Sequence, residues 1–391
     1  MFLTVTAGIL ALILFLGIIS VNFLWTGENK KRVVKILTLT NLFLIALFFG
    51  VFLIRDSVSN SFMEVFGSCA TVFLLTQFFC GAAVIIALII RTIYRKFHKP
   101  TPYSEERRRA LKYSLLYPAM SLAVSLYGNR IERMDIVDRF FEIPIKNLPP
   151  ELQNFTVAQI SDVHLGAYFS LERLQSLLDR IAAAKPDILA ITGDIFDDVD
   201  LNDAAIKLVD SYCEKFKYGI YYCHGNHEHF RGIQRITQQL SKTKINWLVN
   251  QSARVIPNSN LYILGVDYPP AAPVMKSGGR GEKDELFYKQ MQDYLEKSLT
   301  GIPYNATVIL LAHHPEFFDY AAQKNIPLTL TGHTHGAQVW GLHLLEVFKY
   351  TRGMYQKGDC YCYVHSGCGS WFCFRLFTPP EVAYFRLTNK I

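Results

Sequence analysis

The chain has 391 residues, half of them apolar and 14% aromatic, which excludes a disordered or fibrous protein. Its formal net charge is +7, but residues 1–150 carry 17 Lys and Arg against 9 Asp and Glu, whereas the remainder carries 23 against 24. A nearly neutral C-terminal part argues against a nucleic-acid-binding protein, and none is predicted. The basic N-terminal part instead indicates a membrane region with positively charged loops.

Three apolar segments in this basic part are long enough to cross a bilayer, which takes about 20 apolar residues per helix. They cover residues 2–25, 33–54 and 66–90, and Lys35 is the one charged residue among them. Basic residues gather in the first and third loops, so the positive-inside rule places these loops in the cytoplasm and the N-terminus outside.

A fourth, shorter apolar segment covers residues 113–127 and is interrupted by Pro118. It follows the run 107–112, RRRALK, which is similar to a twin-arginine export signal. We expect this segment to cross the membrane and to place the rest of the chain outside the cytoplasm. The alternative is an interfacial helix that leaves the rest inside. The eight cysteines are expected as buried free thiols or, outside the cytoplasm, as one or two disulfides.

Residues 1–127 are therefore predicted to form a multi-pass α-helical membrane region, 128–150 a connector with a strand at 140–145, and 151–391 a separate domain. In that domain β-rich apolar runs alternate with helical patterns, which predicts a layered α/β fold. The glycine-rich segment 271–283 is expected to be a surface insertion. The predicted strands are 155–160, 187–192, 219–223, 261–266, 306–312, 328–330, 361–365 and 382–387, and the predicted helices are 171–184, 203–215 and 283–299.

Polar side chains follow five of these strands, at the point where each strand ends. Ligands bind open α/β sheets at the carboxyl ends of strands, so we expect these side chains to share one cleft. Imidazole, amide and carboxylate donors without a thiolate suit Mn, with Fe, Zn or Mg as alternatives. One ion needs fewer ligands than are present, so two divalent ions are predicted. The candidate side chains at these strand ends are Asp162, His164, Asp194, Asp197, His224, Asn226, His227, Glu228, His313, His314, His333 and His335.

The motifs DxH, GDxxD, GNHE, a later His and GHxH stand in this order over about residues 140–390 and resemble the calcineurin-like metallophosphoesterase family. Residues 363–374 and 379–381 also resemble its bacterial membrane-associated branch, which includes exported phosphodiesterases and enzymes that cleave UDP-diacylglucosamine. The resemblance implies a four-layer β-sandwich flanked by helices with a dinuclear metal site.

Carried over by motif, two sets of three residues resemble the ligands of the two metals. Asp162, His164 and His335 resemble those of the first metal, and Asn226, His313 and His333 those of the second. Asp194 resembles the bridging carboxylate, His227 the catalytic histidine, and Asp197 the carboxylate that orients it.

The chemistry implied is in-line attack on phosphorus by a metal-bridging hydroxide, with an imidazole protonating the departing oxygen. Phosphoprotein phosphatases of the family carry Arg after GDxxD, where this chain has Asp198. An extra carboxylate is poorly suited to a phosphomonoester dianion, so a phosphodiester or pyrophosphate is expected unless a basic residue from elsewhere compensates. Glu228 and His314 are left open between supporting partners of the site and surface residues.

The leading hypothesis is a membrane-anchored, metal-dependent phosphodiesterase or pyrophosphatase with its catalytic domain outside the cytoplasm and a substrate that can be lipid-linked. One alternative is a catalytically silent membrane sensor or binding module, which loss of a bridging ligand would mark. Another is a transporter, disfavoured because the three long segments carry no acid or base near their centres. Partners other than the bilayer and the substrate are not inferred, and no obligate protein partner is predicted.

Overall fold

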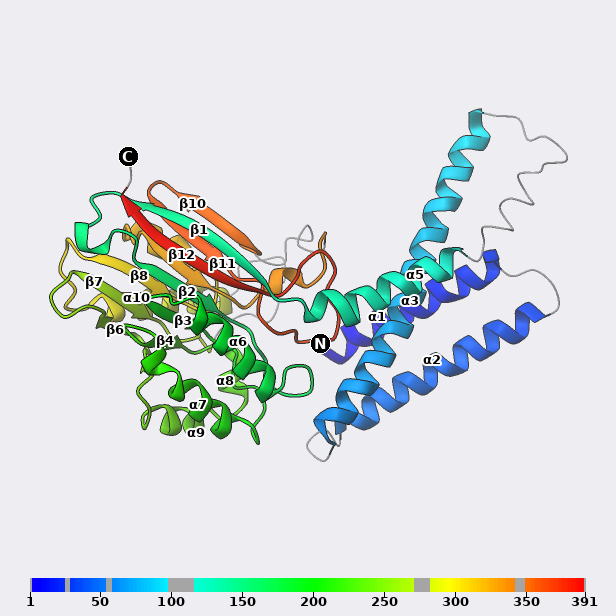
Figure 1. Cartoon of the computed structure of the whole chain (residues 1–391). Coiled ribbons are helices and arrows are strands. Elements are labelled where there is room, and N and C mark those ends of the chain that lie inside the picture. The colour runs from blue at the N-terminus through cyan, green and yellow to red at the C-terminus, as the bar shows by residue number, and fades with distance from the viewer. Residues whose placement is uncertain are drawn as a thin grey trace. The chain divides into compact units, whose positions relative to one another are not determined.

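The computed structural model describes residues 2–24, 29–53, 58–97, 116–270, 282–341 and 349–389. The chain divides into two compact units, residues 1–131 and 132–391 (Figure 1). The run 107–112 and most of the insertion 271–283 lie outside the described residues.

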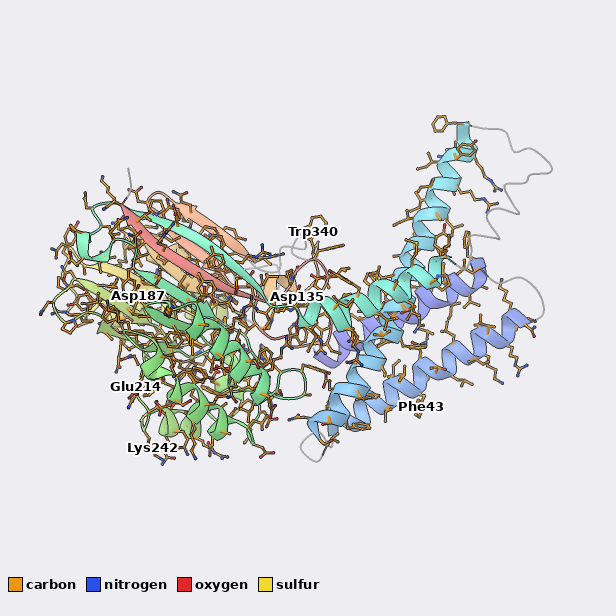
Figure 2. The ribbon with its side chains drawn as sticks, in the orientation of Figure 1. Phe43, Asp135, Asp187, Glu214, Lys242 and Trp340 are labelled. Carbon is orange, nitrogen blue, oxygen red and sulfur yellow. The ribbon has the colours of Figure 1, made fainter. Side chains whose placement is uncertain are left out.

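The first unit is helical, and much of its surface is apolar. Phe43, labelled in Figure 2, is 64% exposed. Among the described residues, α3 alone is a full-length span candidate by length and composition, which by itself is weak evidence. The last α-helix, α5, has 11 residues, or about 16 Å, against the roughly 30 Å of a hydrocarbon core. The multi-pass arrangement therefore stays a prediction. The elements are α1 (Phe2–Leu24), α2 (Asn29–Leu53), α3 (Asn60–Phe97), α5 (Leu116–Leu126) and the π-helix η2 (Tyr127–Ile131).

A buried amide pair joins α2 to α3. Asn41 Nδ2 donates to Gln77 Oε1 at 2.9 Å, and Gln77 Nε2 donates back to Asn41 Oδ1 at 3.3 Å. The first and third helices approach closely beside it, because a Cβ added to Gly81 would lie 2.5 Å from Leu16 Cβ. Small residues and interhelical hydrogen bonds of this kind are typical of helices that pack in lipid.

The second unit contains two mixed six-stranded sheets. The first sheet has the order β1-β12-β2-β3-β4-β5, in which β2 to β5 run parallel. The second has the order β10-β11-β9-β8-β7-β6, in which β11, β9, β8 and β7 run parallel. The strands are β1 (Val137–Ile145), β2 (Thr156–Ile160), β3 (Ile188–Thr192), β4 (Ile220–Cys223), β5 (Asn246–Trp247), β6 (Gln251–Arg254), β7 (Leu261–Gly265), β8 (Thr307–Leu311), β9 (Leu328–Thr331), β10 (Gly353–Lys357), β11 (Cys360–Val364) and β12 (Glu381–Asn389).

Helices cover the outer face of each sheet. The α-helices are α6 (Leu171–Ala183), α7 (Asn202–Ser211), α8 (Asn226–Phe230), α9 (Ile233–Leu240), α10 (Glu282–Leu299) and α11 (Phe317–Gln323). Short 3-10 turns are η3 (Glu132–Met134), η4 (Pro150–Leu152), η5 (Cys213–Lys215) and η6 (His335–Ala337).

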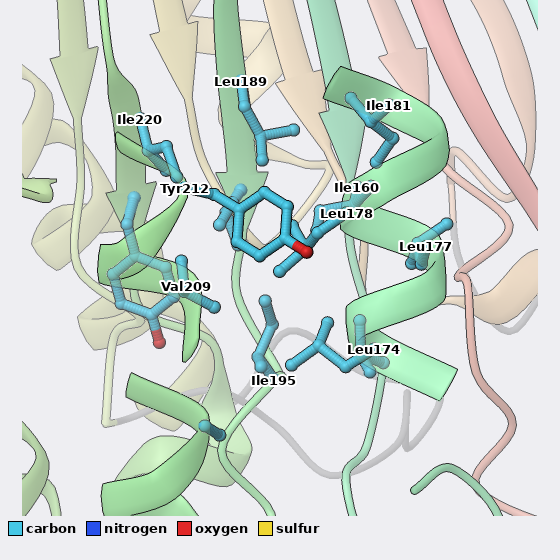
Figure 3. Packing of buried hydrophobic residues seen from close by; sticks show 14 of the residues in the cluster. Ile160, Leu174, Leu177, Leu178, Ile181, Leu189, Ile195, Val209, Tyr212 and Ile220 are labelled. Atoms are coloured by element: carbon cyan, nitrogen blue, oxygen red, sulfur yellow. The ribbon is translucent and has the colours of Figure 1, made fainter. Parts of the chain in front are cut away.

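Three of the apolar clusters among the described residues lie between the four layers of this unit. Side chains of both sheets, such as Val157 and Ile309, meet in a central core. On the outer side of the first sheet, Leu174 and Leu178 of α6 pack against Ile160 (Figure 3). On the outer side of the second sheet, α10 and α11 pack against β7 and β8. The structure confirms the α/β class and the sandwich of two mixed sheets.

Several boundaries differ from the sequence-based expectation. The expected connector contains β1, which starts at Val137 and pairs in parallel with β12 at the edge of the first sheet. The helix expected over 203–215 ends at Ser211 and is followed by a 3-10 turn. The sequence did not predict β5, β6 and β10, which are the outermost strands of their sheets. Edge strands are only partly buried, so their residues do not form the continuous apolar run that marks a buried strand. All eight cysteines are free thiols.

Candidate metal centre

The nine residues singled out in the sequence come together where five parallel strands end. They follow β2, β3, β4, β8 and β9, whose carboxyl ends lie at the same edge of the sandwich. Five of them have a backbone in the left-handed region, which costs a residue other than glycine on the order of 1 kcal/mol or more and clusters at functional sites. Their φ angles are 51° at Asp162, 49° at His164, 55° at Asp194, 74° at His333 and 52° at His335.

Asp162, His164 and His335 form one group of donors. Nε2 of His164 and Nε2 of His335 lie 2.9 Å apart, and Asp162 Oδ1 lies 3.5 Å from the latter. Nδ1 of His164 faces Asp197 Oδ2 at 3.2 Å. A proton shared on that side leaves the Nε2 lone pair directed into the group, which is how metal-binding histidines are held.

Asn226, His313 and His333 form a second group. Asn226 Oδ1 lies 3.1 Å from His313 Nε2 and 2.9 Å from His333 Nδ1. Nδ1 of His313 donates to the carbonyl oxygen of Thr192 at 2.7 Å. That bond again fixes the tautomer whose Nε2 lone pair faces the other donors.

Asp194 lies between the two groups. Its Oδ2 is 3.2 Å from His313 Nε2 and 3.7 Å from His164 Nε2, while its Oδ1 accepts the backbone N–H of His227 at 2.8 Å. Burial would raise the pKa of Asp194, but the charges of His313 and His227 outweigh it and hold this pKa well below its usual range. One buried carboxylate oxygen thus faces both donor groups.

Two glycines of the motifs make this approach possible. A Cβ on Gly225 would lie 2.1 Å from Asp194 Oδ1, and a Cβ on Gly332 would lie 2.3 Å from Asp162 Oδ2. Neither distance is compatible with a side chain.

The arrangement fits two divalent cations in its donor chemistry. Lone pairs of buried imidazoles and carboxylates converge, with His164 and His313 held in the ligand tautomer by bonds on the other ring nitrogen. Ligand atoms of Asp162, His164 and His335, and of Asp162, Asp194 and His313, lie within 4.8 Å of one another. Burying these carboxylates and imidazole lone pairs without a partner would cost free energy, and coordination to a cation would offset that cost.

Residues 155–337 match the calcineurin-like phosphoesterase family. They form a calcineurin-like phosphoesterase domain. An uncharacterized metallophosphoesterase of Campylobacter jejuni is 26% identical over 289 residues, 72% of this chain and 71% of that protein. A zebrafish (Danio rerio) transmembrane protein with metallophosphoesterase domain is 26% identical over 277 residues, 66% of this chain but 59% of that protein. This chain therefore spans less than two thirds of the zebrafish relative.

Among solved structures, a dimetal phosphatase of Danio rerio aligns with a TM-score of 0.35 and 12% identity, over 55% of this chain and 88% of that chain. A likeness this low carries no argument. The matched domain is of a family of metal-dependent phosphoesterases, and the donor chemistry of the site fits two divalent ions.

Next to the two donor groups, Asp197 contacts three cationic or potentially cationic side chains. Its Oδ1 lies 2.9 Å from His227 Nδ1 and accepts from Arg231 Nε at 2.6 Å, and its Oδ2 faces His164. Burial by itself would lower the pKa of His227, but the charge of Asp194 and the hydrogen bond to Asp197 raise it to about 9.

Glu228 and His314, left open from the sequence, both lie inside the phosphoesterase domain. Glu228 is fully buried, and its two carboxylate oxygens accept the backbone N–H groups of Asp194, Ile195, Phe196 and Gly225 at 2.8–3.1 Å. His314 packs against His333 with ring centroids 5.0 Å apart, and burial with the neighbouring His313 lowers its pKa to about 3. Glu228 thus anchors the loop that carries Asp194, and His314 supports His333 as a neutral ring.

A third histidine cluster was not expected from the sequence. Asp267, directly after β7, faces His224 Nδ1 at 3.1 Å and His229 Nε2 at 3.0 Å. Nε2 of His224 accepts the indole N–H of Trp247 at 2.8 Å, so its Nδ1 carries the proton and donates to Asp267. Both nitrogens of His224 are therefore occupied by hydrogen bonds, and the cluster is a hydrogen-bonded support. The rule that polar residues follow strands could have identified Asp267.

The closing stretch of the second unit supports Asp162 from behind. The buried Arg375 guanidinium donates to the carbonyl oxygens of Ser366, Gly369 and Thr378 at 2.5–2.9 Å. The loop so fixed returns to the site, where Gly369 N–H donates to the Asp162 carbonyl oxygen at 2.9 Å. The stretch that resembles the membrane-associated branch in sequence therefore braces the loop that carries Asp162.

Proposed function

We propose that the protein is a membrane-anchored phosphoesterase that uses two divalent metal ions to hydrolyse a phosphodiester or pyrophosphate bond. The observation that carries this proposal is the position of Asp194, whose Oδ2 lies 3.7 Å from His164 Nε2 and 3.2 Å from His313 Nε2. A carboxylate placed between two sets of imidazole donors is suited to bridging two cations. Asp162, His164 and His335 would hold the first ion and Asn226, His313 and His333 the second.

Two such ions supply an activated water and neutralise the charge on the phosphate oxygens. Mn is proposed first because the donors are nitrogen and oxygen without sulfur, and Fe, Zn or Mg are the alternatives. His227 acts as the general acid for the leaving oxygen. Asp197, hydrogen-bonded to its Nδ1, holds the ring so that Nε2 carries the transferable proton.

The membrane part of the proposal is supported by the apolar helices and by the zebrafish relative's name. We propose a multi-pass anchor, a catalytic domain outside the cytoplasm, and a substrate at the bilayer surface, such as a nucleotide-linked lipid. Anchoring raises the effective concentration of the site against lipid headgroups. A reporter that is active only outside the cytoplasm, fused after Ile391, should be active. Activity of a cytoplasm-only reporter at the same point would overturn the topology.

The activity is tested with the purified full chain in detergent and Mn²⁺. The panel contains bis-p-nitrophenyl phosphate, p-nitrophenyl phosphate and a nucleotide-linked lipid. We expect metal-dependent cleavage of the diester or the lipid pyrophosphate, with Asp194→Asn inactive. The matched control is Asp203→Asn, which removes a half-buried carboxylate that lies outside the site and pairs with Arg235 at 2.8 Å. Binding of metal without hydrolysis of any substrate would favour the silent binding module.

A further inference from the structure

Two side chains that the sequence motifs do not include lie beside the proposed general acid. Phe230 and Arg231 stand three and four residues after His227 in and just after the helical turn α8, so all three lie on one face. The rings of His227 and Phe230 have centroids 5.6 Å apart, and Phe230 is 69% exposed. The backbone N–H of Arg231 donates to the His227 carbonyl oxygen at 2.9 Å, which completes the turn.

Arg231 is held by one edge only. Its Nε donates to Asp197 Oδ1 at 2.6 Å, the same oxygen that faces His227 Nδ1 at 2.9 Å. Within the part of the chain that the structure describes, its two Nη groups have no hydrogen-bond partner, and its side chain is 27% exposed. A fixed guanidinium with its remaining N–H groups open to solvent is suited to a phosphate or carboxylate, which it binds through two parallel bonds.

We propose that Arg231 and Phe230 form a leaving-group subsite that takes a second phosphoryl group, so that the bond cleaved is a phosphoanhydride. This inference rests on the proposed function, because it is the general-acid role of His227 that places its neighbours on the leaving-group side. Arg231 pairs with the anionic phosphoryl group, and the exposed ring of Phe230 covers the apolar or aromatic group attached to it.

The reaction balances as a simple hydrolysis. A water oxygen forms a bond to one phosphorus, the bond from that phosphorus to the bridging oxygen breaks, and two phosphate monoesters result. His227 gives its proton to the bridging oxygen and is reprotonated by one proton equivalent from the attacking water. The second water proton is released to solvent.

The charge on the leaving group decides between a phosphoanhydride and an ordinary diester. A leaving phosphate stays anionic after cleavage, so a guanidinium that already faces it stabilises the transition state. A neutral alcohol offers Arg231 nothing to bind. The sequence predicts a phosphodiester or pyrophosphate unless a basic residue from elsewhere compensates for Asp198. Arg231 is a basic residue of this kind, because it binds Asp197, the residue before Asp198. Asp198 itself accepts the backbone N–H of Asp200 through Oδ1 at 3.0 Å.

The test compares the full chain with Arg231→Gln and Arg231→Lys, each loaded with Mn²⁺. The substrates are a nucleoside diphosphate sugar, which contains a phosphoanhydride, and bis-p-nitrophenyl phosphate, whose leaving group carries no phosphate. We expect Arg231→Gln to lower kcat/KM for the anhydride by about 10- to 100-fold, the range for losing a charged hydrogen bond, and for the diester by less than about 3-fold. Arg231→Lys should recover part of the loss, and Arg235→Gln, which removes an exposed guanidinium, should change neither.

A binding measurement provides a readout that does not depend on turnover. By calorimetry, Arg231→Gln should weaken binding of methylenediphosphonate, a non-hydrolysable pyrophosphate, by a similar factor and leave methylphosphonate unchanged, with the same metal content. An equal loss on both substrates would mean that Arg231 only positions Asp197 and would overturn the subsite. Cleavage of the diester without the anhydride would also overturn it while the proposed function stands. If the loaded protein cleaves no phosphoester at all, the proposed function itself is wrong.

Discussion

The two units of this protein bury polar side chains for opposite reasons. In the helical unit the outer faces are apolar, and the buried polar side chains are neutral, among them the amides of Asn41 and Gln77, which satisfy each other. In the phosphoesterase unit the cores are apolar, and the buried polar groups at the strand ends are ionisable ones such as Asp162 and Asp194. A neutral pair can be complete within the protein, whereas converging ionisable donors need cations. The amide pair therefore stabilises the packing of helices, whereas the ionisable cluster is suited to binding ligands.

The largest effect is expected from removing the charge of Asp194, because this change should abolish metal binding, the property that distinguishes the second unit from the first. In Asp194→Asn an amide replaces the carboxylate that faces both donor groups, so the two ions should be lost together with activity. We expect a drop of more than about 100-fold in metal affinity, since even indirect supports of a site contribute that much. Elemental analysis and bis-p-nitrophenyl phosphate hydrolysis measure both. An Asp194→Asn protein that keeps two ions per chain would contradict the bridging role.

The next effect separates catalysis from metal loading within the same site. His227→Ala should keep two ions per chain, because His227 belongs to neither proposed ligand set. Its rate on an alkyl diester, a poor leaving group, should fall by about 10²–10⁴-fold, the contribution of a general acid. The fall should be smaller for a nitrophenyl diester, whose leaving group needs less protonation. Loss of metal, or an equal fall on both substrates, would show that His227 has another role.

A smaller effect is expected from a buried carboxylate that binds backbone instead of metal. Glu228→Gln places an NH₂ group against two of the N–H groups that the carboxylate now accepts, and so loosens the loop of Asp194. Metal affinity should fall by about 10- to 100-fold, measured by competition with a chelator. Glu214→Gln is the matched control, because Glu214, labelled in Figure 2, is exposed and pairs with Lys244. Equal metal affinities in the two variants would argue against the anchoring role.

The smallest effect should come from the helical unit. Gln77→Leu breaks the amide pair and should destabilise the helices by about 0.6–1.7 kcal/mol, the range for hydrogen bonds between membrane helices. Thermal denaturation of the full chain in detergent measures the change. The double variant Asn41→Leu/Gln77→Leu should lose less than the sum of the single variants, because the second substitution removes a partner already lost. Thr38→Val, which removes a hydroxyl bonded within its own helix, is the control, and strict additivity would mean that the pair is not coupled.

Pattern alone predicted most of the strands, because buried strands are continuous apolar runs and both sheets are largely parallel. Pattern together with the motif resemblance also singled out nine polar residues at the strand ends, all of which the structure brings to one place. Pattern did not predict β5, β6 and β10, whose residues are half-exposed or polar, nor the short helices α8, α9 and α11. Residues 128–150 were expected as a connector with a strand at 140–145. That this strand pairs with β12, almost 250 residues later, is a contact that no local signal encodes.

The sequence by itself determined the residue types, their order and the strand ends on which they stand, since these depend on local apolar pattern and motif spacing. Only the tertiary structure decided which side chains share a proton or a charge. It placed Glu228 inside the loop of Asp194, joined Asp267 to His224, and brought Arg231 to the oxygen of Asp197 that faces His227. These contacts join segments about 30 to 40 residues apart through side chains of ordinary local pattern. Their partners are set by how the strands and helices pack, which spacing in the sequence does not specify.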